Sequence, residues 1–369
     1  MARAVKTKKP TIATVAEQAG VAVSTVSRFL NGHYVSATVR ERLSTVIADL
    51  GYSRSWTARN LSLGLRGSVG VLVDSSEDPW FVQLLLGIEE ELVTRDCSLM
   101  LSSLELLGRY DATRVLDWVQ GHRVDGIIVA KSQRRDRPIL RAALDARLSL
   151  VAVVPDETAT DIPVLQCNNI EAGTIVADHL AGLGHTRIAF AGGPPHSIDS
   201  KHRLRGLREG LAAHGIRLDG AQVYSCGGWE LEAGATFAKE LFSQPLDVTA
   251  VVLANDALAL GFLRVAHERG VMVPREISVV GFDGLPFGAL TWPSLTTVAQ
   301  PMREMGRVAC RRLFEGIADP GRIERIQFRM HLIARESTGP APLGGGARRH
   351  LRAVSSEVVR DTPPSNDLV

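Results

Sequence analysis

The segment Thr11–Gly32 constrains the fold more than any other part of this 369-residue chain. Its first apolar residues recur at helical spacing and are Ile12, Val15, Ala16 and Ala19. Thr11 can cap this helix by accepting a backbone N–H, and Gly20 can end it because glycine adopts a left-handed backbone without steric cost. A second short helix is expected over residues 23–30, with Val26 facing inward. Two short helices joined by a tight turn predict a small all-α unit of the helix-turn-helix type.

A third amphipathic helix is predicted between Ser36 and Gly51. Its apolar residues stand at positions i, i+4, i+7, i+8 and i+11, and they are Val39, Leu43, Val46, Ile47 and Leu50. We expect Ser36 to be its N-cap, Gly51 to end it, and Tyr52 to fold back onto the core of the three helices.

The outward positions of the second helix are suited to contact with DNA, and they are Val23, Ser24, Ser27 and Arg28. The guanidinium of Arg28 can donate to O6 and N7 of one guanine together. Charge agrees with this interpretation, since residues 1–66 carry ten Lys or Arg and three Asp or Glu, hence +7, while the remainder carries −5 of the formal total of +2. By the helical pattern alone, any small three-helix bundle remains the alternative.

The first 61 residues resemble the lac repressor (LacI/GalR) family of bacterial transcription factors. The matching pieces include Ala19-Gly20-Val21, Thr25-Val26-Ser27-Arg28, Leu30-Asn31-Gly32, Leu50-Gly51-Tyr52 and Ala58-Arg59-Asn60-Leu61, and the similarity continues past residue 335. The resemblance implies a homodimer on a palindromic operator in double-stranded DNA, with Val23 and Ser24 choosing operator bases and Arg28 reading a base. The other DNA-binding residues that it implies are Thr11, Thr25, Ser27, Asn31, Ala58 and Leu61.

Leu61 matches the leucine that opens the central base step from the minor groove, and a buried helix leucine is the alternative. Two departures from the family affect this region. Ala22 replaces the usual serine before the second helix, which should weaken that helix by about 1 kcal/mol. Arg54-Ser55 replaces the usual Pro-Asn before the hinge helix, so a stiffening proline is absent. We therefore expect a hinge that is more disordered away from DNA.

From Ser68 onward, short β-rich runs alternate with helical stretches. Strands are predicted over 69–73, 97–102, 126–130, 149–154, 187–191, 250–254 and 277–281, and helices over 81–95, 109–121, 171–183, 201–214 and 256–269. This alternation implies parallel sheets, and two of them in tandem predict an α/β unit of two Rossmann-like lobes that resembles the periplasmic-binding-protein type. We expect the chain to cross between lobes near 154–164, 293–298 and 328, and a ligand to lie between the lobes at the carboxyl ends of the strands.

The resemblance implies ligand-binding residues at those strand ends. Ser200–Gly206 matches the pattern Ser-x-x-Arg-x-x-Gly, which makes Arg203 a ligand residue able to donate two parallel hydrogen bonds. The other expected effector residues are Trp80, Phe81, Asn168, Trp229, Asn255 and Asp283. Trp80 and Phe81 could stack on a sugar ring or a base, or only pack at a helix start. Asn168-Asn169 replaces the Asp-Asn of many family members, so a sugar is expected first, while an acidic or phosphorylated ligand becomes more plausible.

These observations divide the chain into a helix-turn-helix domain (1–52), a hinge helix and linker (53–66), a two-lobed effector-binding and dimerisation domain (67–338), and a polar tail (339–369) whose composition favours disorder. The favoured function is a DNA-binding repressor controlled by a sugar-like effector. The alternatives are a cytosolic small-molecule binding protein or an enzyme of the same two-lobed fold.

The motifs of the sequence do not favour an enzyme. The sequence has no Gly-x-Gly-x-x-Gly after a strand, no phosphate loop and no Gly-x-Ser-x-Gly turn. Its four cysteines are far apart without metal-type spacing, so neither a cofactor nor a metal site is expected. A signal peptide is not predicted, and no uncharged apolar stretch reaches about 18 residues. We therefore expect a cytoplasmic protein that does not contact membranes.

Overall fold

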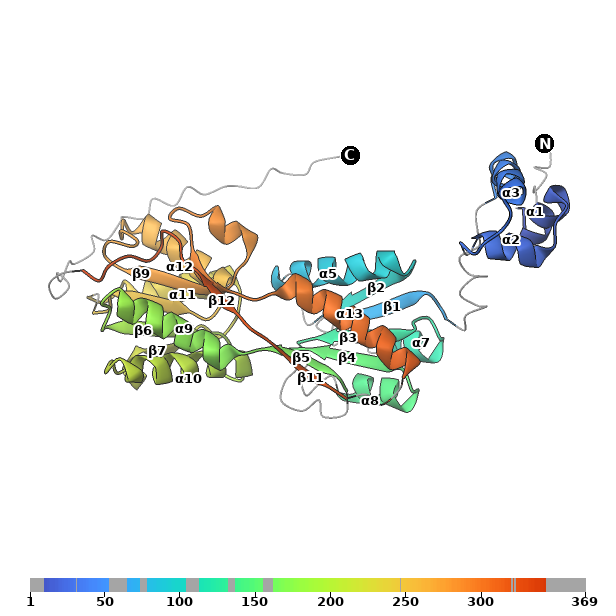
Figure 1. The fold of residues 1–369 in the computed structure, drawn as a ribbon. Coiled ribbons are helices and arrows are strands. Elements are labelled where there is room, and N and C mark those ends of the chain that lie inside the picture. Colours follow the sequence, from blue (N-terminus) through green and yellow to red (C-terminus); the bar gives the residue numbers. More distant parts are fainter. Residues whose placement is uncertain are drawn as a thin grey trace, which may run out of the picture. The chain divides into compact units, whose positions relative to one another are not determined.

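The computed structural model describes residues 10–30, 32–52, 65–73, 78–103, 113–131, 137–154, 162–245, 247–319, 321 and 323–342 (Figure 1). It divides into two compact units, Met1–Gly67 and Ser68–Val369, which are described separately below. The predictions for Asn31, Ala58 and Leu61, for the hinge residues 53–64 and for the tail beyond residue 342 lie outside the described residues.

The first unit contains the three predicted helices, α1 (Ile12–Ala19), α2 (Val23–Leu30) and α3 (Ala37–Leu50). Their buried core consists of Val15, Ala16, Ala19, Val26 and Leu43, with Tyr52 packed against it. Thr11 caps α1 as predicted, since its Oγ1 accepts the backbone N–H of Thr14 at 3.3 Å. Gly20 and Gly51 end α1 and α3 in the left-handed conformation, with φ of 61° and 57°.

Ser36 is the N-cap residue of α3, as predicted, but its hydroxyl makes no capping hydrogen bond. The main-chain carbonyl of Ser36 instead accepts the N–H of Arg40 at 2.9 Å. The residue therefore starts the helix through its backbone alone.

The second unit has two lobes, each built on a six-stranded sheet. The sheet of the first lobe is parallel throughout, in the order β11-β5-β4-β3-β1-β2. Its strands are β1 (Ser68–Val73), β2 (Ser98–Ser103), β3 (Gly126–Ala130), β4 (Ser149–Val153), β5 (Val164–Cys167) and β11 (Arg325–Phe328). The helices of this lobe are α5 (Trp80–Thr94), α7 (Thr113–Gln120), α8 (Arg137–Asp145) and α13 (Met302–Ala318).

Successive side chains of β1 point to opposite faces of the first-lobe sheet, and helices cover both of these faces. Val69, Val71 and Val73 pack into the core that includes the buried residues of α5 and α13, whereas Leu72 packs with those of α7 and α8. Helices α5 and α13 cross at Gly87, where an added Cβ would lie 1.9 Å from the carbonyl oxygen of Arg303. Only glycine allows this close backbone approach between the middle of α5 and the start of α13.

The sheet of the second lobe has the order β12-β10-β9-β8-β6-β7, and only the β10–β12 pair is antiparallel. Its strands are β6 (Ile188–Gly192), β7 (Val223–Ser225), β8 (Ala250–Leu253), β9 (Ser278–Asp283), β10 (Thr296–Ala299) and β12 (His331–Ile333). The helices are α9 (Asn169–Gly182), α10 (Ile198–Ala213), α11 (Leu231–Leu241) and α12 (Asp256–Glu268), with short 3-10 turns η2 (Gly220–Gln222) and η3 (Pro286–Ala289). Helix α9 packs on α10, and α11 on α12 (Figure 1).

The chain crosses between the lobes three times (Figure 1). The first predicted crossing is wrong, because β5 still pairs with β4 and β11 in the first sheet, so the chain leaves that lobe only after Cys167. The second crossing, predicted near 293–298, lies after the end of β10 at Ala299. Strand β10 pairs with β9 in the second sheet, and the next helix, α13, packs on the first lobe. The third, between β11 and β12, falls beside Phe328 as predicted. None of the described helices is long and apolar enough to span a membrane.

Candidate functional site

The second helix of the first unit presents the face that the sequence predicts. Val23 is 46 % exposed, and Ser24 and Arg28 are also exposed, while Val26 is fully buried in the core. Thr25 and Ser27 are half-buried, and Thr11 is exposed at the start of α1. The exposed residues near the N-terminus of α2 are thus free to approach the edges of bases in a major groove.

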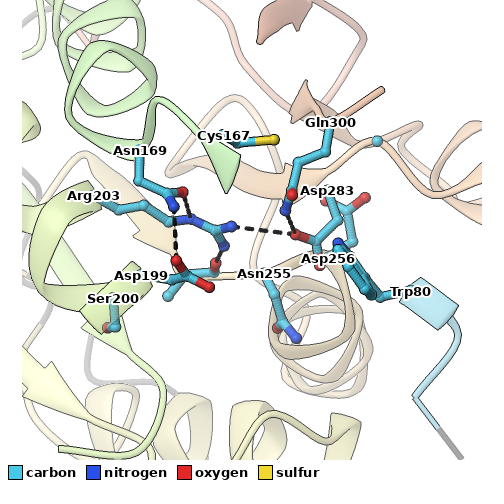
Figure 2. Close-up of polar contacts among 12 residues, drawn as sticks. Trp80, Cys167, Asn169, Asp199, Ser200, Arg203, Asn255, Asp256, Asp283 and Gln300 are labelled. Carbon is cyan, nitrogen blue, oxygen red and sulfur yellow. Dashed lines mark hydrogen bonds and ion pairs between the residues drawn. The ribbon is translucent and has the colours of Figure 1, made fainter. Parts of the chain in front are cut away.

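In the second unit, Arg203 lies at the centre of a buried polar network that faces the space between the lobes (Figure 2). Its side chain comes from α10 and is only 3 % exposed. Nε donates to Oδ1 of Asn169 at 2.8 Å, Nη1 donates to the carbonyl of Ala254, and Nη2 lies 3.5 Å from Oδ1 of Asp283. Nδ2 of Asn169 in turn donates to Asp199 at 2.8 Å. All three nitrogens of Arg203 are therefore held by residues of the second lobe.

Asp283 ends β9 with a φ of 112°, a backbone conformation that side chains other than glycine rarely adopt. Its Oδ1 accepts the Nε2–H of Gln300 at 2.6 Å. Behind it, Asp256 is fully buried and accepts the backbone N–H of Leu285 at 2.7 Å and the hydroxyl of Thr297 at 2.6 Å. Burial raises the pKa of both carboxyls, that of Asp256 further because Asp283 lies near. Strain and buried charge are concentrated at this strand end, as is typical of a functional site.

The first lobe contributes the start of α5 and a lysine that sequence reasoning missed. Trp80 and Phe81 are 1 % and 2 % exposed, and their rings meet edge to face at 5.2 Å. Lys131 donates from Nζ to Oδ2 of Asp78 at 2.8 Å and lies 4.7 Å from the centroid of the Trp80 ring. Burial lowers the pKa of Lys131, but the carboxylates of Asp78 and Asp283 outweigh it, so the pKa lies above its ordinary value. The position of Lys131 directly after the apolar strand β3 was the signal that could have identified it.

Two asparagines predicted to bind the ligand also cap helices. Asn255 caps α12 by accepting from the N–H of Leu258 at 2.8 Å, and its Nδ2 donates to the carbonyl of Trp229 at 3.0 Å, although the residue still lines the cleft. Asn168 caps α9 through the N–H and carboxylate of Glu171, each at 3.1 Å, and it lines none of the described cavities of the cleft. The role of Asn168 in effector binding stays a prediction, and the neighbouring Asn169 is the amide that contacts Arg203.

Two adjoining cavities lie at this site. The inner one, of about 10 Å³, is lined by residues of both lobes, including Trp80, Arg203, Asn255 and Asp283, and has room for about one water molecule. The outer one, of about 770 Å³, is lined in part by Phe81 and several apolar side chains and shares Lys131 and Trp229 with the inner one. Its size lies in the range of small-molecule pockets.

A helix-turn-helix unit joined to two parallel α/β lobes with a polar cleft defines a class of proteins: ligand-responsive, DNA-binding regulators. Two family models match the chain, "Bacterial regulatory proteins, lacI family" over residues 11–55 and "Periplasmic binding protein-like domain" over residues 177–338.

Two curated relatives illustrate the similarity. The ribose operon repressor of Escherichia coli is 30 % identical over 332 residues, which span 89 % of this chain and 99 % of that protein. The regulator MalR of Streptomyces coelicolor is 34 % identical over 350 residues, or 90 % of this chain and 97 % of that protein.

Solved structures agree. The lac repressor dimer bound to operator and the anti-inducer ONPF aligns with a TM-score of 0.74 at 27 % identity, covering 90 % of this chain and all of that one. A complex of the regulator CelR with cellobiose aligns at 0.66 and 30 % identity, covering 89 % and 99 %. The chain belongs to the lacI family of bacterial transcriptional regulators. It is a LacI-type repressor that binds DNA and carries an effector-binding regulatory domain, and it is not an enzyme.

Proposed function

We propose that this protein binds a palindromic operator as a cytoplasmic homodimer and that a sugar-like effector between the lobes controls its affinity for that operator. Support for the DNA contact comes from the exposed side of α2, where Val23, Ser24 and Arg28 are solvent-accessible beside a firmly packed core. We further propose domain boundaries near residues 52, 66 and 338, with Leu61 as the minor-groove wedge of the hinge.

The observation that carries the effector proposal is the Arg203–Asp283 pair. Both side chains are buried, they lie 3.5 Å apart, and both line the inner cavity. An arginine and a carboxylate held side by side can bracket adjacent hydroxyls of a polyol, one donating and the other accepting. Among the similar proteins, a ribose operon repressor and a CelR–cellobiose complex carry sugar names.

The small volume of the inner cavity supports control of DNA binding by the effector. A sugar ring does not fit into about 10 Å³, so an effector that reaches Arg203 and Asp283 must separate the lobes or bind a more open arrangement. The effector can shift the equilibrium between two arrangements only by its differential affinity for them, and each tenfold difference corresponds to about 1.4 kcal/mol. The head then responds to whichever arrangement is populated.

The test is affinity selection of genomic fragments with the purified protein, followed by sequencing and by anisotropy titration of the recovered site. We expect a short palindrome upstream of a few genes, bound about 10- to 100-fold more weakly by Arg28→Ala. Arg205→Ala is the matched control, because Arg205 is an exposed arginine of the second unit paired with Glu209. Diffuse, salt-sensitive recovery without a shared sequence would contradict the proposal, as would unchanged operator affinity of Arg28→Ala.

A further inference from the structure

We propose that Trp80 determines effector specificity by donating a hydrogen bond from its indole Nε1–H to an uncharged oxygen of the effector. This inference rests on the proposed function, which places the effector in the cleft, and it goes further by naming a donor and the charge of the ligand.

The first observation is that Nε1 of Trp80 is buried and has no hydrogen-bond partner among the described residues. A buried donor without a partner is costly, and the great majority of such groups in native proteins are satisfied. Trp80 also lines the inner cavity, where Figure 2 shows its ring beside Asp283. An effector that separates the lobes at this cavity can bring an oxygen to this N–H and supply the missing acceptor.

The second observation is that the indole is held in place before any ligand arrives. The backbone N–H of Trp80 donates to Oδ1 of Asp78 at 2.9 Å, Lys131 lies 4.7 Å from the ring centroid, and Phe81 meets the ring edge to face. Because these contacts fix the ring, little conformational freedom is lost when the N–H finds a partner. The donor therefore discriminates between ligands by the atom that each presents to it.

The third observation concerns charge. The two cations that line the inner cavity are already paired, Lys131 with Asp78 at 2.8 Å and Arg203 with Asp283 at 3.5 Å. The carboxylate of Asp199 also lines this cavity. Its partner Asn169 is a neutral amide, so that hydrogen bond does not balance the negative charge of Asp199. A phosphate or carboxylate placed here would meet Asp199 and Asp283 without an unpaired cation to offset them. An uncharged hydroxyl or ring oxygen accepts from Trp80 without that repulsion.

The experiment measures binding by titration calorimetry to the full chain, with neutral sugars and their anionic counterparts as probes: D-ribose and ribose 5-phosphate, D-glucose and glucose 6-phosphate, cellobiose and cellobionate, maltose and maltobionate. We expect at least one neutral sugar to bind, and its anionic counterpart to bind at least about tenfold more weakly. Trp80→Phe keeps an aromatic ring and removes only the donor, so it should weaken that neutral sugar about tenfold.

Trp118→Phe is the matched control, because Trp118 is buried in the first-lobe core away from the cleft, and it should change the affinity by less than twofold. Equal or tighter binding of the anionic member by the wild-type protein would overturn the inference, and this comparison needs no variant. An affinity of Trp80→Phe within twofold of the wild type would also overturn it. If no probe binds while the operator is still bound normally, the sugar effector of the proposed function is rejected and this inference is rejected with it.

Discussion

The two walls of the cleft are built differently. On the second-lobe wall, the side chains of Arg203, Asn169 and Asn255 are each held by hydrogen bonds within the protein. On the first-lobe wall, the indole N–H of Trp80 has no partner among the described residues. One wall is thus a prearranged scaffold and the other carries a free donor. We therefore expect the second lobe to contribute stability and orientation and the first lobe to contribute selectivity.

The largest expected effect comes from breaking the scaffold. Arg203→Ala leaves a carboxylate, an amide and a carbonyl without their shared donor in a buried site, and we expect it to destabilise the protein by about 3–5 kcal/mol. Urea unfolding followed by circular dichroism measures this loss. Arg205→Ala, on the exposed side of the same helix, is the matched control and should leave the unfolding midpoint unchanged. A midpoint for Arg203→Ala equal to that of the control would remove the difference between the walls.

A smaller effect tests the buried carboxyl of the same wall. The pKa of Asp256 is raised to about 8. The folded state therefore binds more protons than the unfolded state, and stability should fall as the pH rises from about 4 towards 8. Asp256→Asn removes this charge and should be more stable than the wild type at pH 8, on the order of 1–3 kcal/mol, and no more stable at pH 4. Chemical unfolding at both pH values measures the difference, and an equal gain at each would contradict the assignment.

The first-lobe wall should tolerate change with the least loss of stability. In the Lys131–Asp78 pair, the side chains are 25 % and 23 % exposed, so water can replace the ammonium when it is removed. We expect Lys131→Met to cost less than about 1 kcal/mol in thermal unfolding, because partly exposed ion pairs contribute little. A loss as large as that of Arg203→Ala would show that both walls are scaffolds.

The sequence anticipated the second-lobe wall better than the first. Runs such as 126–130 and 250–254 are apolar throughout, which is typical of strands buried on both faces, and both form strands. Arg203 and Asp283 were predicted from the resemblance to the family, and both line the cavity. Lys131 directly follows the predicted strand 126–130 but was not recognised as part of the site, and Gln300 carries no such local signal.

Other features of the structure could not be read from local pattern. Asn168 and Asn169 are adjacent and chemically identical, so the pattern could not decide which one caps α9 and which one reaches Arg203. Helix α13 was not predicted, although Met302, Met305, Ala309 and Leu313 are buried along it at helical spacing. Its charged residues form ion pairs with Glu90 and Glu91 of α5, a relation between segments more than 200 residues apart that local pattern does not contain.

The most direct test of the account is operator titration of Asp283→Ala, with and without a saturating concentration of the neutral sugar that binds the wild-type protein. Asp283 lies in the cleft and outside the DNA-binding unit. We predict that the variant binds the operator with wild-type affinity and that the sugar no longer changes this affinity. A response to the sugar equal to that of the wild type would contradict the claim that the cleft controls the head.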